Sequence, residues 1–481
     1  MFGWFKKAEK PAKRRSFEAA KVNRLVASWL SVSQSINKDL KGGLDQLRVR
    51  SRDLAQNEPM AAKYLSLVSA NVIGARGIAL QARVAEDNGN QDKFANIAIE
   101  EAWGEWGKKY CDVSGRMSIN DIERLLIECV ARDGEALILE HQSFDNPHGY
   151  SLQVIDIDRL ATSLERNAEK GKNAILMGVE IDSRGRPVAY HLKKNVDRIA
   201  GETERYPAEK IIHLFMAKLP EQVRGYPWAH SVMVRMFHLK KYQEFALVAS
   251  AVGASKMGFF KQPEGDGSQL ADDEDQETGE LFQEAAAGQF GILPEGVDFV
   301  PFNPDYPHQM YAEFIKTAKR DISSGLNVSY HSLANDLEGV NFSSIRSGTL
   351  EEREQWMVAQ DWFINAFMER VYSNWLKNAL LKGAIVTTNG KPIPASKLAK
   401  FSEHEFLGRR WQWVDPLKDV KANVEAMNAG LMSPYVIAAQ QGSDAEEIID
   451  DISRFQTYVT DKGVVLQSPK NDNQAIEDVS N

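Results

Sequence analysis

Hydrophobic residues between positions 344 and 382 recur every three or four residues, which is the spacing of one face of a helix. This stripe consists of Trp356, Ala359, Phe363, Phe367, Val371, Trp375 and Ala379. No proline interrupts the segment, and Ser343 or Ser344 can cap its start. A continuous helix over these positions would be roughly 58 Å long at about 1.5 Å per residue. Its first part, 346–355, is mostly polar, so the pattern predicts one half in a core and one half facing water, other subunits or a lumen. An ordinary helix broken near Gly348 is an equally good interpretation.

A turn-rich segment precedes this helix. The pattern predicts a helix over 311–324 and then a loop of small and polar residues that favour turns. The loop contains Gly325, Asn327, Ser329, Asn335, Asp336, Gly339 and Asn341. We therefore expect a helix, a loop and a long helix in succession.

The rest of the chain mixes both periods, and it predicts an α+β fold. We expect helices over 16–40, 58–71, 94–108, 118–132, 228–256, 416–428, 433–441 and 445–458. We expect strands over 78–83, 135–140, 151–157, 176–181, 187–192, 211–215 and 385–388, with a hairpin turn at 182–185. Gly42 and Gly43 are predicted to end the first helix, and Asn57 to cap the second.

Three arginines, Arg48, Arg50 and Arg52, alternate with other residues, so they would share one side of an extended segment. They can bind phosphate or the carboxylates of a neighbouring subunit, or they can simply face water.

Composition limits the function classes. The chain has 481 residues, 43% of them hydrophobic and 26% charged, which leaves room for two or three globular domains. Its net charge of −9 opposes tight wrapping of DNA, because phosphate binding depends on clustered Lys and Arg. The segment 264–284 holds nine carboxylates and no Lys or Arg, and we expect a solvated loop there. No stretch reaches the roughly 18 apolar residues of a membrane span, so we expect no membrane partner.

Signals for catalysis are weak. No P-loop occurs, and the two cysteines and nine histidines form no metal-binding pattern, so we expect no cofactor and no metal. His331 beside Ser332 is a candidate base and nucleophile, and Asp336 with Glu338 is a candidate carboxylate pair. Because neighbours in sequence seldom face each other, and because the carboxylates lie in a Gly- and Asn-rich loop, a mobile acidic loop is the simpler interpretation.

The segment NDLEGVNFSSIRSGTLEERE, 335–354, resembles the tunnel-loop and tunnel-helix signature of the lambda family of tailed-phage portal proteins. Further blocks at 133–135, 178–190 and 222–228 resemble the same family in the same order, and the resemblance extends over roughly 48–445. One departure is Phe342, where the family pattern has Tyr.

The resemblance implies a portal-type fold. Its parts would be a basic N-terminal arm and helix (1–47), an α/β wing (48–225), a first stem helix (226–257), a clip (258–306), a second stem helix (307–325), a tunnel loop (326–343), a long tunnel helix (344–382), a helical C-terminal crown (383–467) and a disordered tail (468–481).

The resemblance also implies the function of a portal: a homo-oligomeric ring, by family a dodecamer, at one capsid vertex, assembled in the host cytoplasm and retained in the virion. Double-stranded DNA would pass through its channel during packaging and ejection. The terminase large subunit and then a head-completion or tail adaptor protein would bind the clip, and the major capsid and scaffold proteins would surround the ring.

By the same resemblance, particular residues receive roles. The loop residues near DNA would be Asn327, Ser329, Asn335, Asp336, Glu338 and Asn341. Stem residues that meet DNA or a neighbouring subunit would be Lys316, Lys319 and Arg320, and subunit contacts would involve Arg48, Arg50, Arg52 and Arg346. Two rival interpretations are another virion adaptor ring and a hydrolase that uses His331 or the Asp336 and Glu338 pair.

Overall fold

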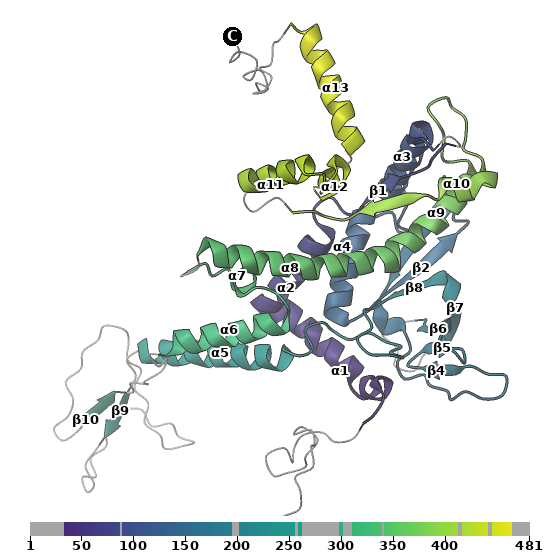
Figure 1. Cartoon of the computed structure of the whole chain (residues 1–481). Coiled ribbons are helices and arrows are strands. Elements are labelled where there is room, and N and C mark those ends of the chain that lie inside the picture. Colours follow the sequence, from purple (N-terminus) through teal and green to yellow (C-terminus); the bar gives the residue numbers. More distant parts are fainter. Residues whose placement is uncertain are drawn as a thin grey trace, which may run out of the picture.

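The computed structural model describes residues 33–86, 89–194, 202–254, 258–261, 298–301, 310–338, 341–411, 416–440 and 445–463. It has the mixed α+β content that the sequence predicts. Figure 1 shows α8 and α9 crossing the middle of the molecule, with the sheets of residues 136–214 on one side and α5 and α6 projecting together from the other. We use the word wing only as a label for residues 48–225. The C-terminal helices α11 to α13 lie beyond α8, and Lys93 lies 3.6 Å from Asp450 in the last of them.

The first described helix, α1 (Ile36–Asn57), corrects the sequence prediction at three points. It runs through Gly42 and Gly43, because the face that includes Leu40 and Leu44 is buried, which offsets the roughly 1 kcal/mol that each glycine costs. The three arginines near position 50 therefore lie on a helix and not on an extended segment. The helix also crosses the expected boundary between 47 and 48, while the basic arm lies outside the described residues.

The next elements form the helical part of the wing. In α2 (Pro59–Val68) the predicted cap is wrong: Asn57 ends α1, and the Glu58 carboxylate accepts the Ala61 N–H at 2.7 Å. A π-helical turn (Ser69–Ile73) follows, and then come α3 (Lys93–Lys109) and α4 (Ile119–Asp133) close to their predicted positions. Ser118 and Asp121 form a reciprocal capping box at the start of α4.

The wing contains two antiparallel sheets. The first has the strand order β3 (Tyr150–Ile155), β2 (Ala136–Gln142), β8 (Ile211–Leu214). The second has the order β4 (Ala174–Leu176), β5 (Val179–Ile181), β6 (Pro187–Lys193), β7 (Thr203–Pro207).

The predicted strand 176–181 is thus two short strands, because Met177 and Gly178 turn the chain with positive φ. The hairpin turn at 182–185 is confirmed by the bond from Asp182 N–H to the Arg186 carbonyl at 2.9 Å. A third, two-stranded sheet joins β1 (Ala79–Ala82) to β11 (His404–Leu407), which the sequence did not reveal.

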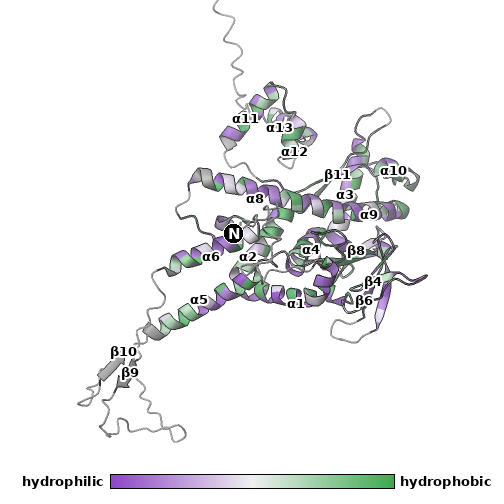
Figure 2. Cartoon of the chain, turned by 60° about the horizontal axis from the view of Figure 1, so that its bottom comes forward, coloured by the Kyte–Doolittle hydropathy of each residue, from purple (hydrophilic) through white to green (hydrophobic). Residues whose placement is uncertain are grey.

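Two helices project from this body. They are α5 (Met233–Ala254) and α6 (Tyr311–Gly325), and the rings of Tyr242 and Tyr311 stack between them at 5.7 Å. The helix α5 begins five residues later than predicted, since 228–232 form turns. Beyond them β9 (Gly258–Lys261) pairs with β10 (Asp298–Pro301), and the acidic segment 264–284 lies outside the described residues. Figure 2 shows hydrophobic positions along α5 and α6. Several apolar side chains of these two helices stay exposed: Val234, Phe237, Phe245, Leu247, Val248 and Phe314.

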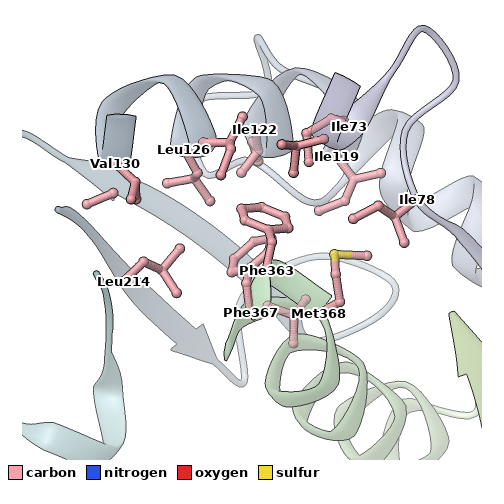
Figure 3. Close-up of a cluster of buried hydrophobic side chains, with 14 of the residues drawn as sticks. Ile73, Ile78, Ile119, Ile122, Leu126, Val130, Leu214, Phe363, Phe367 and Met368 are labelled. Carbon is pink, nitrogen blue, oxygen red and sulfur yellow. The ribbon is translucent and has the colours of Figure 1, made fainter. Parts of the chain in front are cut away.

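The long helix is confirmed. It consists of α8 (Phe342–Phe363), one π-helical turn (Ile364–Met368) and α9 (Glu369–Lys382), and it continues through Gly348. Ser343 and Ser344 lie inside α8, so neither is its N-cap. All seven residues of the predicted stripe are buried. Figure 3 shows Phe363 and Phe367 packed against α4 residues such as Ile122 and Leu126, so this stripe forms the centre of the main core.

The C-terminal part is mostly helical. An isolated bridge between Val386 and Pro392 replaces the predicted strand 385–388. A 3-10 turn (Ala395–Lys397) and α10 (Leu398–Phe401) lead to β11. The helices α11 (Pro416–Asn428), α12 (Pro434–Gln440) and α13 (Ala445–Asp461) follow near their predicted positions. The predicted caps Asp415 and Asp444 and the tail 468–481 lie outside the described residues.

Candidate functional site

The loop between α6 and α8 is folded around a short helix, α7 (Tyr330–Ala334). The Ser329 hydroxyl caps α7 by accepting the Ser332 N–H at 3.2 Å. Glu352 of α8 accepts the Ser332 hydroxyl at 2.9 Å and the Ser329 N–H at 3.2 Å. Its other oxygen accepts the Trp356 indole N–H at 3.2 Å, and Glu352 is only 8% exposed. The long helix therefore fixes the position of the loop.

A second set of contacts surrounds Asp336. The Tyr330 hydroxyl donates to one oxygen of this carboxylate at 2.6 Å, and the Lys316 ammonium lies 3.6 Å from the same oxygen. The Tyr330 hydroxyl bond lowers the pKa of Asp336. Burial, with the carboxylate charge as a further cause, raises the pKa of Tyr330 to about 12. Asp336 is thus an anion held between a neutral phenol and a cation.

The loop residues chosen from the sequence are partly brought together. Asn327 and Asn335 both have positive φ, 55° and 52°, a conformation that Asn tolerates better than most residues. The Glu338 N–H donates to Asp336 at 3.0 Å, while the Glu338 side chain and Asn341 are exposed. Residues 339–340 lie outside the described residues. Within 326–338 the loop is folded, with contacts from α7, Glu352 and Asp336.

Two cations of α6 lie beside this loop. Lys316 pairs with Asp336, and the Arg320 guanidinium lies over the Tyr330 ring at 5.5 Å. Burial raises the pKa of the Glu58 carboxyl, and the nearby Lys240 and Lys319 charges oppose that rise. Two of the three predicted stem residues, Lys316 and Arg320, therefore contact the loop of their own chain.

The same geometry does not form a hydrolytic site. His331 Nδ1 donates to the Asp336 carbonyl at 2.7 Å, whereas the Ser332 hydroxyl bonds Ser329 and Glu352. Nucleophile and base are therefore not paired. Asp336 has Tyr330 and Lys316 as partners, so it does not share a proton with Glu338.

A buried ionic cluster joins the wing to the segment before α5. Its centre is Glu135, which is 0% exposed. Arg224, also 0% exposed, donates to both Glu135 oxygens at 2.6–3.0 Å, and His213 Nε2 lies 2.8 Å from Glu135. Burial alone would raise the pKa of Glu135, but the Arg224 charge and the His213 bond hold that pKa well below its usual range. Burial lowers the pKa of His213, so we treat it as a neutral N–H donor.

The predicted interface arginines belong partly to this cluster. Arg48 is 2% exposed and donates to Glu135 at 2.8 Å and to Asp158 at 2.9 Å. Arg52 donates to Asp133 at 2.8 Å and to Asp158 at 2.6 Å. Both side chains have partners inside their own chain, whereas Arg50 is exposed. Arg346 lies 3.3 Å from Asp419 of α11.

Two glycines allow the two chain segments that carry Glu135 and Arg224 to approach each other closely. Gly134 has a φ of +91°, and a Cβ there would lie 2.2 Å from the Tyr226 backbone. A Cβ at Gly225 would lie 2.1 Å from the Gly134 carbonyl oxygen. The chain segments 133–135 and 222–228, far apart in sequence, therefore meet with no room for a side chain between them.

Sequence reasoning missed Glu135, Glu352 and Arg224 as structural anchors. Glu135 and Arg224 stand in segments that the sequence analysis singled out, but a single sequence gives no sign that these segments pair. In the described ranges no group of three or more His, Cys, Asp or Glu could hold a metal ion. No helix within those ranges is long and apolar enough to cross a membrane.

A family model and relatives over most of the chain match this sequence. The model of the family described as phage portal protein, lambda family, matches residues 22–360. A probable portal protein of Halomonas phage phiHAP-1 is 33% identical over 460 residues, which cover 92% of this chain and 87% of that protein. Portal protein B of Escherichia phage lambda is 22% identical over 464 residues, covering 88% of this chain and 85% of that protein. A chain from the neck of a native GTA particle, computed with C12 symmetry, aligns over 82% of this chain and 93% of that chain, with 13% identity and a TM-score of 0.45.

Proposed function

Because the chain belongs to the lambda family of phage portal proteins, structural components of the virion and not enzymes, we propose that it forms a ring around a DNA channel at one capsid vertex. The observation that carries this proposal is the family match over 22–360, which spans the wing, α5, α6, the loop around α7 and most of α8. The ring would contain about a dozen copies, as the family implies, and would assemble in the host cytoplasm before it becomes part of the virion. Because the chain belongs to this family, we prefer the portal to the two alternatives, another virion adaptor ring and a hydrolase.

In this proposal the loop borders the channel. Asn327, Ser329, Asn335, Asp336, Glu338 and Asn341 are the residues nearest the passing double-stranded DNA. The anchoring of α7 on Glu352 supports this role, because a loop that meets a moving polymer must resist displacement. An anionic Asp336 suits a channel in which contacts with DNA stay weak, since a carboxylate repels phosphate.

The cations of α6 lie on the second stem helix of this proposal. Lys316, Lys319 and Arg320 would meet DNA or a neighbouring copy. Lys316 and Arg320 already contact Asp336 and Tyr330, which favours loop positioning as a part of their role.

The projecting pair α5 and α6, with the clip 258–306 between them, would bind other proteins. Its partners would be the terminase large subunit during packaging and then a head-completion or tail adaptor protein. The exposed apolar residues of α5, such as Phe245 and Leu247, support a surface that is covered in the assembled particle. The major capsid and scaffold proteins would surround the ring.

The subunit contacts proposed for the arginines are now divided. Arg50 is exposed and remains a candidate. Arg48, Arg52 and Arg346 have carboxylate partners in their own chain, so we propose that they shape the surface of the subunit and do not bind across it.

Two experiments test the proposal. The mass of the purified full chain, with negative-stain images of the same sample, should show rings of about a dozen copies with a central hole. A stable monomer at high concentration would contradict the proposed ring.

The double variant Asp336→Asn, Glu338→Gln should keep rings but reduce DNA packaging. The matched control is Asp145→Asn, Glu169→Gln, two exposed carboxylates of the wing. Normal DNA filling by the loop variant would remove the loop from the channel.

A further inference from the structure

Two arginines share one aromatic ring where α8 meets the segment leading to α11. The Arg353 guanidinium lies 5.8 Å from the centre of the Trp411 ring, and the Arg409 guanidinium lies 5.7 Å from it. We call Arg353, Arg409 and Trp411 the arginine cluster. Stacking on Trp411 holds both planar groups in fixed positions.

The charge of this cluster is not neutralised within the described part of the chain. Arg353 is half-buried, and its Nε is buried without a hydrogen-bond partner. Arg409 donates only to neutral acceptors, the Ala70 carbonyl and the Asn71 side-chain oxygen. Asp419 of α11 forms its ion pair with Arg346, and its charge also acts on Arg353.

Burial disfavours the charge of both arginines. It lowers the pKa of Arg353, and the charge of Asp419 opposes that fall. Burial, and then the charge of Arg353, lower the pKa of Arg409. Burial therefore opposes the charge of both guanidinium groups, and an anion bound beside them would reduce that cost.

Two carboxylates, opposite in charge to the arginine cluster, lie on the exposed face of α8. Glu354 and Asp361 are exposed and lie seven residues apart, which is about two helical turns on one stripe. Neither makes an ion pair within the described ranges. Figure 2 shows that α8 carries strongly hydrophilic residues along its length.

One chain cannot join these two features. Glu354 directly follows Arg353, and adjacent residues on a helix point about 100° apart. In a cyclic ring, however, every copy places α8 at the same height and radius, and neighbouring copies meet through two different surfaces. Such a ring brings the α8 of one copy to the level at which the arginine cluster of the next copy lies.

From this charge complementarity we propose that a second copy of this chain occupies the arginine cluster, with the carboxylates of its Glu354 and Asp361 bound to Arg353 and Arg409. This inference rests on the proposed ring and names the contact that closes it at the level of α8. Each carboxylate accepts N–H bonds from a guanidinium that is already oriented by Trp411, so little side-chain entropy is lost on binding.

A DNA phosphate is the other anion that could enter. The cluster fits it less well, because stacked, half-buried arginines hold an anion in one place, while DNA must slide past every copy. A carboxylate on the neighbouring copy, in contrast, stays in one place.

The test uses charge reversal in the full chain. Arg353→Glu and Glu354→Arg should each raise about tenfold or more the protein concentration at which half of the chains are in rings, because each places like charges opposite each other. The charge-swapped variant Arg353→Glu, Glu354→Arg should restore assembly to near the unmodified value. Arg184→Glu, at an exposed turn in the wing, is the matched control and should change nothing. Glu354 is exposed, so Glu354→Arg tests the contact even where Arg353→Glu weakens the fold.

The outcomes separate the two proposals. Rings that are indifferent to both single reversals, or a swapped variant that does not recover, would overturn this inference alone. Normal rings of Arg353→Glu that retain less DNA would overturn it in favour of phosphate. An unmodified chain that forms no rings at any concentration would overturn the proposed function, and this inference with it.

Discussion

Two carboxylates organise polar contacts in this protein, and they do so in opposite settings. Glu135 in the wing is fully buried, with Arg224, Arg48 and His213 around it. Asp336 in the loop lies near the surface, with Tyr330 and Lys316 as its partners. Water can replace the partners of Asp336 but cannot reach Glu135. The first cluster therefore determines whether the wing and the segment before α5 stay joined, while the second adjusts the shape of a loop that already has another anchor.

The largest expected effect comes from neutralising the buried carboxylate. Glu135→Gln leaves Arg224 and Arg48 as buried cations without their common partner, and we expect a loss of about 3–5 kcal/mol in the free energy of unfolding. Urea denaturation of the full chain measures it. Glu165→Gln, which removes the partner of the more exposed Lys41, is the control and should cost less than about 1 kcal/mol. Similar losses in both variants would mean that burial does not distinguish these ion pairs.

The next effect concerns the anchor of the loop. Glu352→Ala leaves the Ser329 N–H, the Ser332 hydroxyl and the Trp356 indole N–H without their acceptor, and we expect a loss of about 1–3 kcal/mol. In hydrogen exchange, the amides of 326–338 should exchange faster in this variant than in the unmodified chain, while those of β2 should not change. Unchanged protection of the loop would show that α7 holds its position without Glu352. The neighbouring exposed Glu351→Ala serves as the control.

Acid should act on the wing cluster in a predictable direction. The folded-state pKa of Glu135 is lowered, so its contribution to stability is complete above the unfolded pKa of about 4.5 and is lost as the pH falls below that value. The free energy of unfolding should fall by up to about 1.4 kcal/mol per pH unit from this one group. Urea titrations at pH 5, 4 and 3 measure the slope, and Glu135→Gln should show a shallower one. An equal slope in the variant would place the acid sensitivity in other carboxylates.

The smallest effect is expected at the exposed carboxylate. Tyr330→Phe removes one hydroxyl bond to Asp336, but Lys316 and water remain, so the free energy of unfolding should change by less than about 1 kcal/mol. Thermal unfolding and ring mass should both match the unmodified chain. Tyr190→Phe, at a buried tyrosine of β6, serves as a comparison for loss of a hydroxyl in the core. A loss of several kcal/mol in Tyr330→Phe would mean that Asp336 is as important to the fold as Glu135.

The elements with strong periodicity were predicted well. The stripe from Trp356 to Ala379 is buried throughout, because a repeat of three to four residues without proline leaves one face of a helix apolar. The helix α4 also lies within one residue of its predicted range, 118–132. In contrast, the helix end predicted at Gly42 and Gly43 is wrong, because the gain from burying Leu40 and Leu44 cannot be read from local sequence. The short strands β7 and β11 were missed for a related reason, since each depends on a partner that is distant in sequence.

The candidate site divides in the same way. The sequence placed Asn335, Asp336 and Glu338 together in one loop, because turn-forming residues are recognised locally. It did not show that Glu352 anchors this loop, or that Arg48 turns inward to Glu135, since both contacts join residues from different elements.

By itself, the sequence determined the helices with a clear apolar face, the loop before α8, the family and the absence of a nucleotide-binding motif, because each of these is written in residues close together along the chain. Only the tertiary structure decided which charges meet. Arg224 reaches Glu135 across 89 positions, and Arg353 and Arg409 meet at Trp411. Charge interactions depend on distance and burial in space, and both are set by packing between elements that no local pattern describes.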